Sequence, residues 1–150
     1  MDFVRDLGAE AFAAFGTYGP LLPEWFVRPG VVTFVAEHGG RRAGFAMIAF
    51  YEAKHGWIGD LLAIAVAPSQ RHAGLGSRLL DRVFEEALET AKSVPIGSVE
   101  LSVAETNASA RRLFERKGFG VLNAKAGYYD GGQRTMRLTR PVDAGRKGAT

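Results

Sequence analysis

Residues 66–80 read VAPSQRHAGLGSRLL, and this stretch predicts a turn from an apolar strand into an amphipathic helix. Pro68 marks the turn, and the pattern Arg-x-x-Gly-x-Gly runs from Arg71 to Gly76. Glycine lets the backbone come close to a ligand. The first N–H groups of a helix lack partners within the helix and lie at the positive end of its dipole, so they bind anions. The stretch therefore predicts a cradle for a phosphate group, unless Gly74 and Gly76 only shape the turn.

Two better-known phosphate-binding motifs do not match this stretch. A P-loop requires a lysine directly after its second glycine, and Ser77 stands after Gly76. The dinucleotide-binding pattern requires a third small residue three positions after Gly76, where this chain has Leu79. Neither motif identifies the anion, so the rest of the chain must do so.

The amino-acid composition limits the class of protein and excludes several kinds of site. The chain has 47% hydrophobic and 23% charged residues, which is typical of a soluble globular protein, and its 150 residues suffice for one domain with its own core. It has no cysteine, which excludes disulfides, thiolate metal ligands and a cysteine nucleophile. The net charge of +3 mildly favours anionic ligands and gives no argument for nucleic acid.

The first residues, the apolar runs and the histidines indicate where the protein is located and whether it binds a metal. Residues 1–6 show no basic segment followed by an apolar run, so we expect no signal peptide. No run of apolar residues is long enough to span a membrane, so we expect a cytoplasmic protein with no membrane partner. His38, His55 and His72 lie apart and have no neighbouring carboxylate cluster, so we expect no metal site.

Apolar periodicity predicts a mixed α/β (α+β) domain over residues 1–142, followed by a frayed tail over residues 143–150. Strands are expected at residues 31–37, 43–51, 58–67, 99–103, 119–123 and 134–139. Helices are expected at residues 3–15, 75–91 and 107–117. Gly118 should end the last helix in a left-handed conformation. The sequence from Tyr128 to Gly132 is expected in the loop between the last two strands.

A second block, residues 101–119, reads LSVAETNASARRLFERKGF, which predicts a strand, an asparagine, a helix and Gly-Phe. Together the two blocks resemble the GNAT family of acyl-CoA-dependent N-acyltransferases, over residues 34–138. The resemblance implies a GNAT fold, with a central, twisted, mixed and mostly antiparallel sheet of about six to seven strands flanked by about four helices. The first strand of that fold is either residues 2–5 or absent.

The resemblance also implies acetyl-CoA as the acyl donor. The residues implied in binding it are Ile64, Ala65 and Val66 along the pantetheine arm, Arg71, His72, Ala73, Gly74, Leu75, Gly76 and Ser77 at the pyrophosphate, Asn107 near the thioester, and Ala110 and Phe114 beside the thiol. Arg71, Arg78 and Arg111 either reach the phosphates through charge-assisted bonds or lie in solvent as ordinary surface residues.

The reaction implied is direct transfer of an acetyl group from the thioester to a primary amine. The developing oxyanion needs a donor, for which the Val66 backbone N–H is a candidate. Many family members carry a tyrosine at the position of Phe114 as the proton donor to the leaving thiolate, and this chain departs from them. A thiol with a pKa of roughly 8.5 leaves tolerably without a donor. Tyr128 or Tyr129 either replaces that donor or is an exposed loop residue.

The general base has two candidates. Some relatives that acetylate protein N-termini carry a glutamate at the position of Ser102, which cannot act as a base alone. Other members use a glutamate at the start of the central strand, where this chain has Asp60. Asp60 is therefore the first candidate, with a cap at the strand start as the alternative. Glu105 is the second candidate, with a surface residue before the helix as the alternative.

The acceptor is less well indicated than the donor. Tyr128 and Tyr129 before the last strand resemble the arrangement in ribosomal-protein N-terminal acetyltransferases. This favours a protein or peptide amine, such as an N-terminus or a lysine, over a small amine. The alternative is a non-catalytic acyl-CoA-binding sensor or regulatory module, which the departures at Phe114 and Ser102 support. A homodimer is left open.

Overall fold

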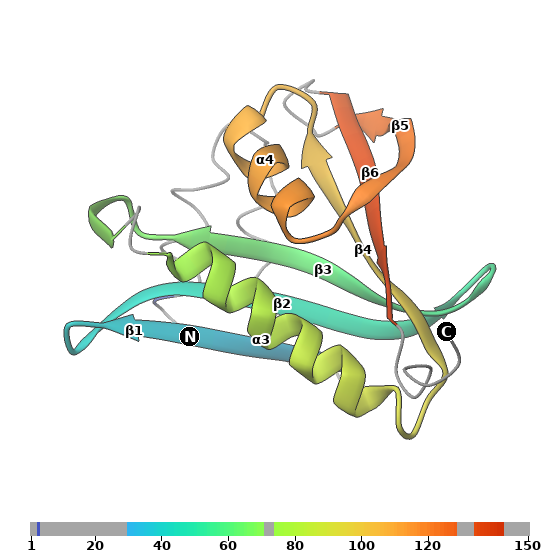
Figure 1. Cartoon of the computed structure of the whole chain (residues 1–150), viewed down its shortest axis with the longest axis horizontal. Helices are drawn as coiled ribbons and strands as arrows, with labels where there is room; N and C mark the ends of the chain where they lie inside the picture. The colour runs from blue at the N-terminus through green and yellow to red at the C-terminus, as the bar shows by residue number, and fades with distance from the viewer. Residues whose placement is uncertain (1–2, 4–29, 71–73, 129–133, 143–150) are drawn as a thin grey trace.

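The computed structural model describes residues 3, 30–70, 74–128 and 134–142, with the backbone alone for residues 123–128. Six strands form one sheet in the order β1-β2-β3-β4-β6-β5 (Figure 1). The pair β3–β4 is parallel and the other pairs are antiparallel, which confirms the predicted mixed, mostly antiparallel sheet. The strands are β1 Val31–His38, β2 Arg41–Ala53, β3 Gly56–Val66, β4 Ile96–Ala104, β5 Gly120–Tyr128 and β6 Arg134–Pro141.

Two α-helices lie in the described part of the chain, α3 Leu75–Thr90 and α4 Ala108–Arg116, with a 3-10 turn at Pro68–Gln70. Both helices were predicted, but the count is below the expected four. The helix expected at residues 3–15 falls outside the described residues except for Phe3. Phe3 has a helical conformation, so it does not belong to the strand considered at residues 2–5.

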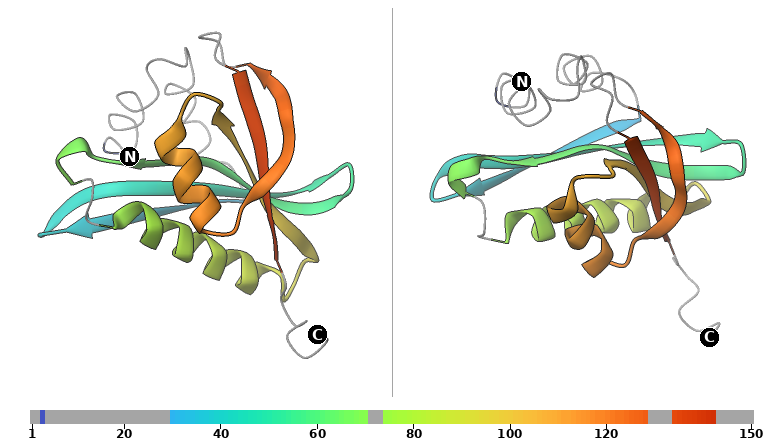
Figure 2. Two further views of the ribbon diagram at one scale, coloured as in Figure 1. Left: turned by 45° about the horizontal axis from the view of Figure 1, so that its top comes forward. Right: turned by 90° about the horizontal axis from the view of Figure 1, so that it is seen from above.

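The helices α3 and α4 cover one face of the sheet, as Figure 2 shows. The buried stripe of α3 consists of Leu75, Leu79, Leu80, Val83, Phe84 and Ala87. It joins one core cluster with inward residues of the central strands, among them Ile48, Leu61 and Leu101. A second cluster, which includes Phe45 and Met47, lies on the opposite face. Burying each large apolar side chain contributes about 1.5–3 kcal/mol, so α3 is fixed firmly beneath the sheet.

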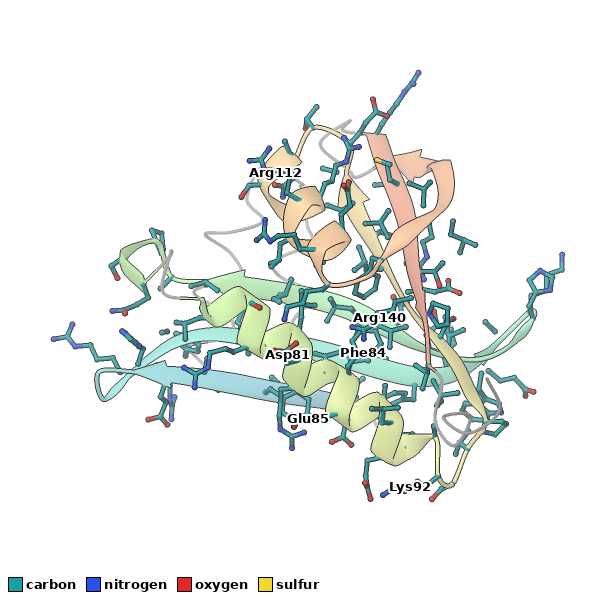
Figure 3. The ribbon with its side chains drawn as sticks, viewed as in Figure 1. Asp81, Phe84, Glu85, Lys92, Arg112 and Arg140 are labelled. Carbon is teal, nitrogen blue, oxygen red and sulfur yellow. The ribbon has the colours of Figure 1, made fainter. Side chains whose placement is uncertain are left out.

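The C-terminal end of α4 is held by an arginine from the last strand. Gly118 follows the helix with φ of 90°, as predicted, and this left-handed conformation suits glycine. Arg140 Nη1 donates to the Lys117 carbonyl oxygen at 2.9 Å, and its guanidinium lies 3.8 Å from the Phe84 ring centroid (Figure 3). Arg140 thereby connects β6, α4 and α3.

The final hairpin differs from the prediction. Strand β5 continues to Tyr128, which pairs with Arg134, so Tyr128 ends a strand and does not lie in the loop. The register shifts between Asn123 and Gly127. Residues 124–127 read AKAG and carry no apolar alternation, and pairing to β6 supplies the backbone bonds that local sequence does not predict. Tyr129 lies outside the described residues.

Candidate active site

Strands β3 and β4 separate toward their C-terminal ends. They pair from Trp57 with Ile96 as far as Leu61 with Leu101, with one register shift between Trp57 and Ile58, although β3 continues to Val66 and β4 to Ala104. Figure 1 shows the two strands side by side at one end and apart at the other. An irregularity in the β2–β3 pairing falls at Leu62, directly after the last β3–β4 pair. The sheet therefore opens between β3 and β4, where an extended ligand can lie along β3.

Helix α3 begins close to the C-terminal end of β3. Gly74 precedes it with φ of 77°, and a Cβ built there meets nothing within 4 Å. The first helical N–H bond runs from Arg78 to the Gly74 carbonyl oxygen at 3.1 Å. The amides of Leu75, Gly76 and Ser77 lie in the turn before it, where they can donate to an anion. Arg71, His72 and Ala73 lie outside the described residues.

Gly76 has a packing role that the sequence did not reveal. A Cβ at Gly76 would lie 3.1 Å from Leu113 Cδ2, so the missing side chain lets α4 approach the first turn of α3. This contact places the start of α3 beside α4, next to the opening between β3 and β4. The role of this turn as a phosphate cradle stays a prediction.

Asn107 lies at the N-terminus of α4, on the other side of the opening. Its Oδ1 accepts a hydrogen bond from the Ala110 N–H at 3.2 Å, so Asn107 caps the helix. An asparagine before a helical stripe is a typical N-cap signal, which the sequence reasoning passed over. Because Oδ1 faces the helix, the Nδ2 group is the part of the side chain that can donate to a ligand.

Phe114 belongs to the core rather than to an open surface. Its side chain is 4% exposed, and its ring centroid lies 5.8 Å from that of Phe119 in an edge-on arrangement. Ala110, one turn earlier, is partly buried beside the same core. The role of both residues beside the thiol stays a prediction.

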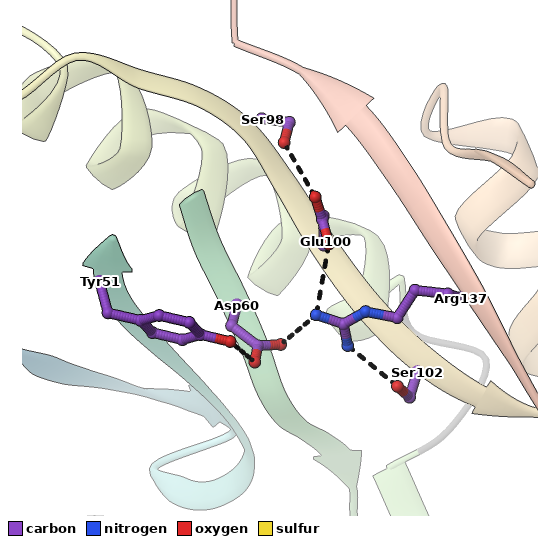
Figure 4. A network of polar contacts seen from close by, with 6 residues as sticks. All are labelled: Tyr51, Asp60, Ser98, Glu100, Ser102 and Arg137. Carbon is purple, nitrogen blue, oxygen red and sulfur yellow. Dashed lines mark hydrogen bonds and ion pairs between the residues drawn. The ribbon is translucent and has the colours of Figure 1, made fainter. Parts of the chain in front are cut away.

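A polar network crosses the strands one residue before the sheet opens. Asp60 lies inside β3, four residues after its start at Gly56, so it is not a cap at the strand start. The Tyr51 hydroxyl donates to Asp60 Oδ2 at 2.7 Å, and Arg137 Nη2 lies 3.4 Å from Asp60 Oδ1 (Figure 4). Asp60 is 15% exposed and Arg137 is 21% exposed. Both carboxylate oxygens of Asp60 are therefore held, each by a different strand.

Arg137 also contacts β4. Its Nη2 lies 3.4 Å from Glu100 Oε1, and its Nη1 donates to Ser102 Oγ at 2.9 Å. Ser98 Oγ donates to Glu100 Oε2 at 3.4 Å. Glu100 is the register partner of Asp60 in the parallel pair, so the two carboxylates lie on adjacent strands and share one guanidinium.

Tyr51 remains a hydrogen-bond donor at neutral pH. Partial burial raises the pKa of its phenol to about 12, and the hydrogen bond to Asp60 and the negative charge of Asp60 act in the same direction. The neutral phenol therefore faces the Asp60 carboxylate as a donor throughout the physiological range.

Comparison with known proteins identifies this arrangement. Residues 2–119 match the acetyltransferase (GNAT) family. The chain belongs to the GNAT family. It is 30% identical over 133 residues to N-alpha-acetyltransferase 20 of Dictyostelium discoideum, covering 87% of this chain and 73% of that protein.

Two solved structures share the fold. A putative GNAT acetyltransferase from Desulfovibrio desulfuricans is 27% identical, with a TM-score of 0.68 over 93% of this chain and 90% of that one. The ribosomal-protein-S18-alanine N-acetyltransferase from Escherichia coli is 21% identical, with a TM-score of 0.65 over 83% and 76%. Like its family, this GNAT chain is an acetyl-CoA-dependent enzyme that transfers an acetyl group to an amine.

The residues of this GNAT chain fit acetyl-CoA. The opening beyond Leu61 and Leu101 can take the pantetheine arm beside β3, and the open space at Gly74 leaves room for a pyrophosphate at the start of α3. When bound, acetyl-CoA supplies an activated acyl group. The candidate groups of the protein are the amides at the start of α3, the Asn107 amide, and the Asp60 carboxylate one residue before the opening.

The remaining predicted residues lie outside this network. Glu105 follows β4 as an exposed residue, five residues and therefore roughly 16 Å along the chain from Glu100. Its N–H donates to the Arg134 carbonyl oxygen at 2.7 Å, and its carbonyl oxygen accepts from Arg111 Nη1 at 3.0 Å. Arg111 thus has a structural partner, while Arg78 is exposed on α3.

The sequence reasoning missed Tyr51, Glu100 and Arg137. The alternation of Val99, Leu101 and Val103 was recognised, but the residues between them, which include Glu100, were not assigned to a shared face. Because side chains alternate along a strand, Glu100 and the other residues between these apolar ones point away from the core, toward the face that carries Asp60. Tyr51 and Arg137 are distant in sequence from Asp60, and only the strand order brings them together.

Within residues 3, 30–70, 74–128 and 134–142, no group of three or more metal-ligating side chains gathers. No helix in the same ranges has the length and apolarity that a membrane crossing requires.

Proposed function

We propose that this chain acetylates the amine of a protein or peptide, with the N-terminal α-amino group as the preferred acceptor. The 30% identity to an N-alpha-acetyltransferase supports this acceptor class. An α-amino group has a pKa of roughly 8, against roughly 10.4 for lysine, so a carboxylate base deprotonates it more readily near neutral pH. The position of Asp60 one residue before β3 and β4 separate, with its carboxylate held by Tyr51 and Arg137, is the observation that supports the proposal.

Asp60 is the proposed general base. The amine nitrogen forms a bond to the thioester carbonyl carbon, the bond from that carbon to sulfur breaks, and the amine proton passes to Asp60 directly or through one water. Among the described residues, Tyr51 contacts one Asp60 oxygen and Arg137 the other, and a carboxylate oxygen accepts two hydrogen bonds, so these contacts leave an acceptor site on each. Glu105 is the second candidate, and its distance along the chain from Glu100 makes it the weaker one.

The thiolate leaves without a proton from Phe114, which has none to give. A free thiol pKa of roughly 8.5 makes the thiolate a tolerable leaving group. Tyr128 and Tyr129 are proposed to border the acceptor, as a proton donor to the thiolate or as a contact for the peptide. Replacing each by phenylalanine separates these roles, because loss of a donor lowers kcat and loss of a peptide contact raises the acceptor KM.

The proposal is tested by release of CoA from acetyl-CoA with a panel of peptides that differ at their first two residues, lysine-containing peptides with blocked N-termini, and small amines. We expect turnover with free peptide N-termini and acetylation at the α-amino nitrogen by mass spectrometry. Turnover only with blocked lysine peptides or small amines would refute the proposed acceptor. Binding of acetyl-CoA without turnover on any amine would instead favour the sensor module.

Variants at the candidate bases test the assignment within the same assay. Asp60→Asn keeps the shape of the side chain and should lower kcat by about a hundredfold or more, with acetyl-CoA affinity unchanged. Glu105→Gln should leave kcat near that of the unmodified chain. Glu52→Gln, at an exposed position of β2 beside Tyr51, is the matched control. The reverse ranking of Asp60 and Glu105 would move the base role to Glu105.

A homodimer is proposed along the edge of the sheet at β5. Val121 and Leu122 on this edge strand are 59% and 53% exposed. Light scattering should then give a mass twice the 16.2 kDa of one chain, and a Leu122→Lys variant should give the single-chain mass. A single-chain mass for both proteins would refute the dimer.

A further inference from the structure

The Asp60 carboxylate is held from both sides of β3 by side chains that no sequence motif marks. Tyr51 reaches it from β2, with a hydrogen bond of 2.7 Å to Oδ2. Arg137 reaches it from β6, past the intervening strand β4, with 3.4 Å from Nη2 to Oδ1. The two donors take different oxygens, so together they fix the plane of the carboxylate as well as its position (Figure 4).

Arg137 is itself fixed by β4. Ser102 Oγ accepts from Nη1 at 2.9 Å, and Glu100 Oε1 lies 3.4 Å from Nη2. A planar guanidinium with several donors can satisfy these partners at once, whereas a lysine ammonium is a single charge on a flexible stem. The guanidinium therefore connects β3 and β4 one residue before the pair ends at Leu61 and Leu101, where the sheet opens.

We propose that Tyr51 and Arg137 are positioning residues for acetyl transfer, which fix the plane of the Asp60 carboxylate and aim its remaining acceptor sites at the amine. The proposal rests on the proposed function, because it takes Asp60 as the base. It assigns the network a role in the reaction beyond joining the strands of the sheet.

The charges of the network follow from its members. Asp60 and Glu100 each carry a negative charge, Arg137 carries a positive charge, and Tyr51 is neutral because the pKa of its phenol is about 12. One negative charge remains in excess, which favours a protonated amine before it gives up its proton. Without the guanidinium, two carboxylates on adjacent strands repel each other, and the Asp60 carboxylate loses the partner that fixes its Oδ1 atom.

The kcat at saturating amine and acetyl-CoA tests the proposal, because a purely structural network would change stability and leave kcat of the folded variants in place. For Arg137→Gln we expect kcat to fall by about tenfold with the KM for acetyl-CoA unchanged, because Asp60 Oδ1 is no longer held. For Tyr51→Phe we expect a smaller loss of kcat, because a neutral donor is lost. Arg137→Lys keeps the positive charge and should restore part of kcat, while kcat stays below that of the unmodified chain.

Controls keep folding and chemistry apart. Each variant is first measured for circular dichroism and for acetyl-CoA affinity, which should match the unmodified chain. Arg42→Gln, at an exposed position of β2 outside the network, should leave kcat unchanged. If Arg137→Gln fails to fold, Tyr51→Phe and Arg137→Lys still decide the question.

The outcomes distinguish this inference from the proposed function. Unchanged kcat for Tyr51→Phe and for the folded Arg137 variants, with Asp60→Asn inactive, would overturn the positioning role and leave Asp60 as the base. Full turnover of Asp60→Asn would refute the base assignment and the positioning role together. A chain that acetylates no amine would overturn both proposals.

Discussion

Asn107 should have two separable roles, and a pair of substitutions tests both. Its Oδ1 caps α4 through the Ala110 N–H at 3.2 Å, and its Nδ2 group is the part proposed to donate to acetyl-CoA. Asn107→Ala removes the capping oxygen and the amide together. Asn107→Ser keeps a capping oxygen, because serine is as good an N-cap as asparagine, but removes the amide donor.

The magnitudes follow from the two hydrogen bonds. Loss of an N-cap costs about 1 kcal/mol, which for a chain of 150 residues lowers Tm by about 3 °C. Loss of one hydrogen bond to a ligand costs about 1 kcal/mol, which raises the KM for acetyl-CoA by about fivefold. Asn107→Ala should therefore show both effects, and Asn107→Ser should show the change in KM with little change in Tm.

Thermal unfolding followed by circular dichroism gives Tm, and CoA release at saturating amine gives the KM for acetyl-CoA. Ser109→Ala, an exposed substitution on the same helix, is the matched control. An unchanged Tm for Asn107→Ala would refute the capping contribution. An unchanged KM for Asn107→Ser would refute the donor role and leave Asn107 as a helix cap alone.

Three further predictions concern other parts of the molecule. Gly74→Ala places a Cβ in open space but at φ of 77°, so it should lower the free energy of unfolding in urea by about 1 kcal/mol and raise the KM for acetyl-CoA. A variant as stable as the unmodified chain would contradict this. Tyr51 should ionise near pH 12 in an ultraviolet titration, and because its folded pKa exceeds the unfolded value of about 10, its contribution to stability should be lost as pH rises from about 10 to 12. Tyr51→Phe should remove the titration step near pH 12, and loss of a step near pH 10 instead would contradict the raised pKa of Tyr51. Arg140→Ala removes a hydrogen bond to the Lys117 carbonyl and a cation–π contact with Phe84, so it should lower the free energy of unfolding in urea by about 2 kcal/mol. Arg140→Lys should be intermediate, and an equal loss of stability in both variants would exclude a role for the guanidinium fork.

The sequence predicted the elements whose signals are local. Helix α3 follows from a stripe of apolar residues at helical spacing that begins at Leu75, and the observed helix begins at that residue. Gly118 was expected in a left-handed conformation, and φ of 90° confirms it. In both cases the energetic cause lies within a few residues of the position, so the local sequence suffices.

The sequence could not predict features that depend on strand order. The polar network needs Tyr51, Asp60 and Arg137, which come from three strands and meet only because β6 lies beside β4 and β4 lies beside β3. The predicted end of β5 was wrong for the same reason, since its later half pairs with β6 without an apolar pattern of its own. Gly76 leaves room for Leu113 in a contact between two helices, and this contact likewise became visible only in the structure.

A crystal structure with acetyl-CoA tests most directly whether the opening between β3 and β4 is the acyl-donor site. We expect the pantetheine arm along residues 64–66, the pyrophosphate within hydrogen-bond distance of the amides of residues 74–77, and the thioester between the Asn107 amide and the Asp60 carboxylate. A cofactor bound on another face of the sheet, or a thioester out of reach of Asp60 with the Tyr51 and Arg137 contacts intact, would contradict this expectation.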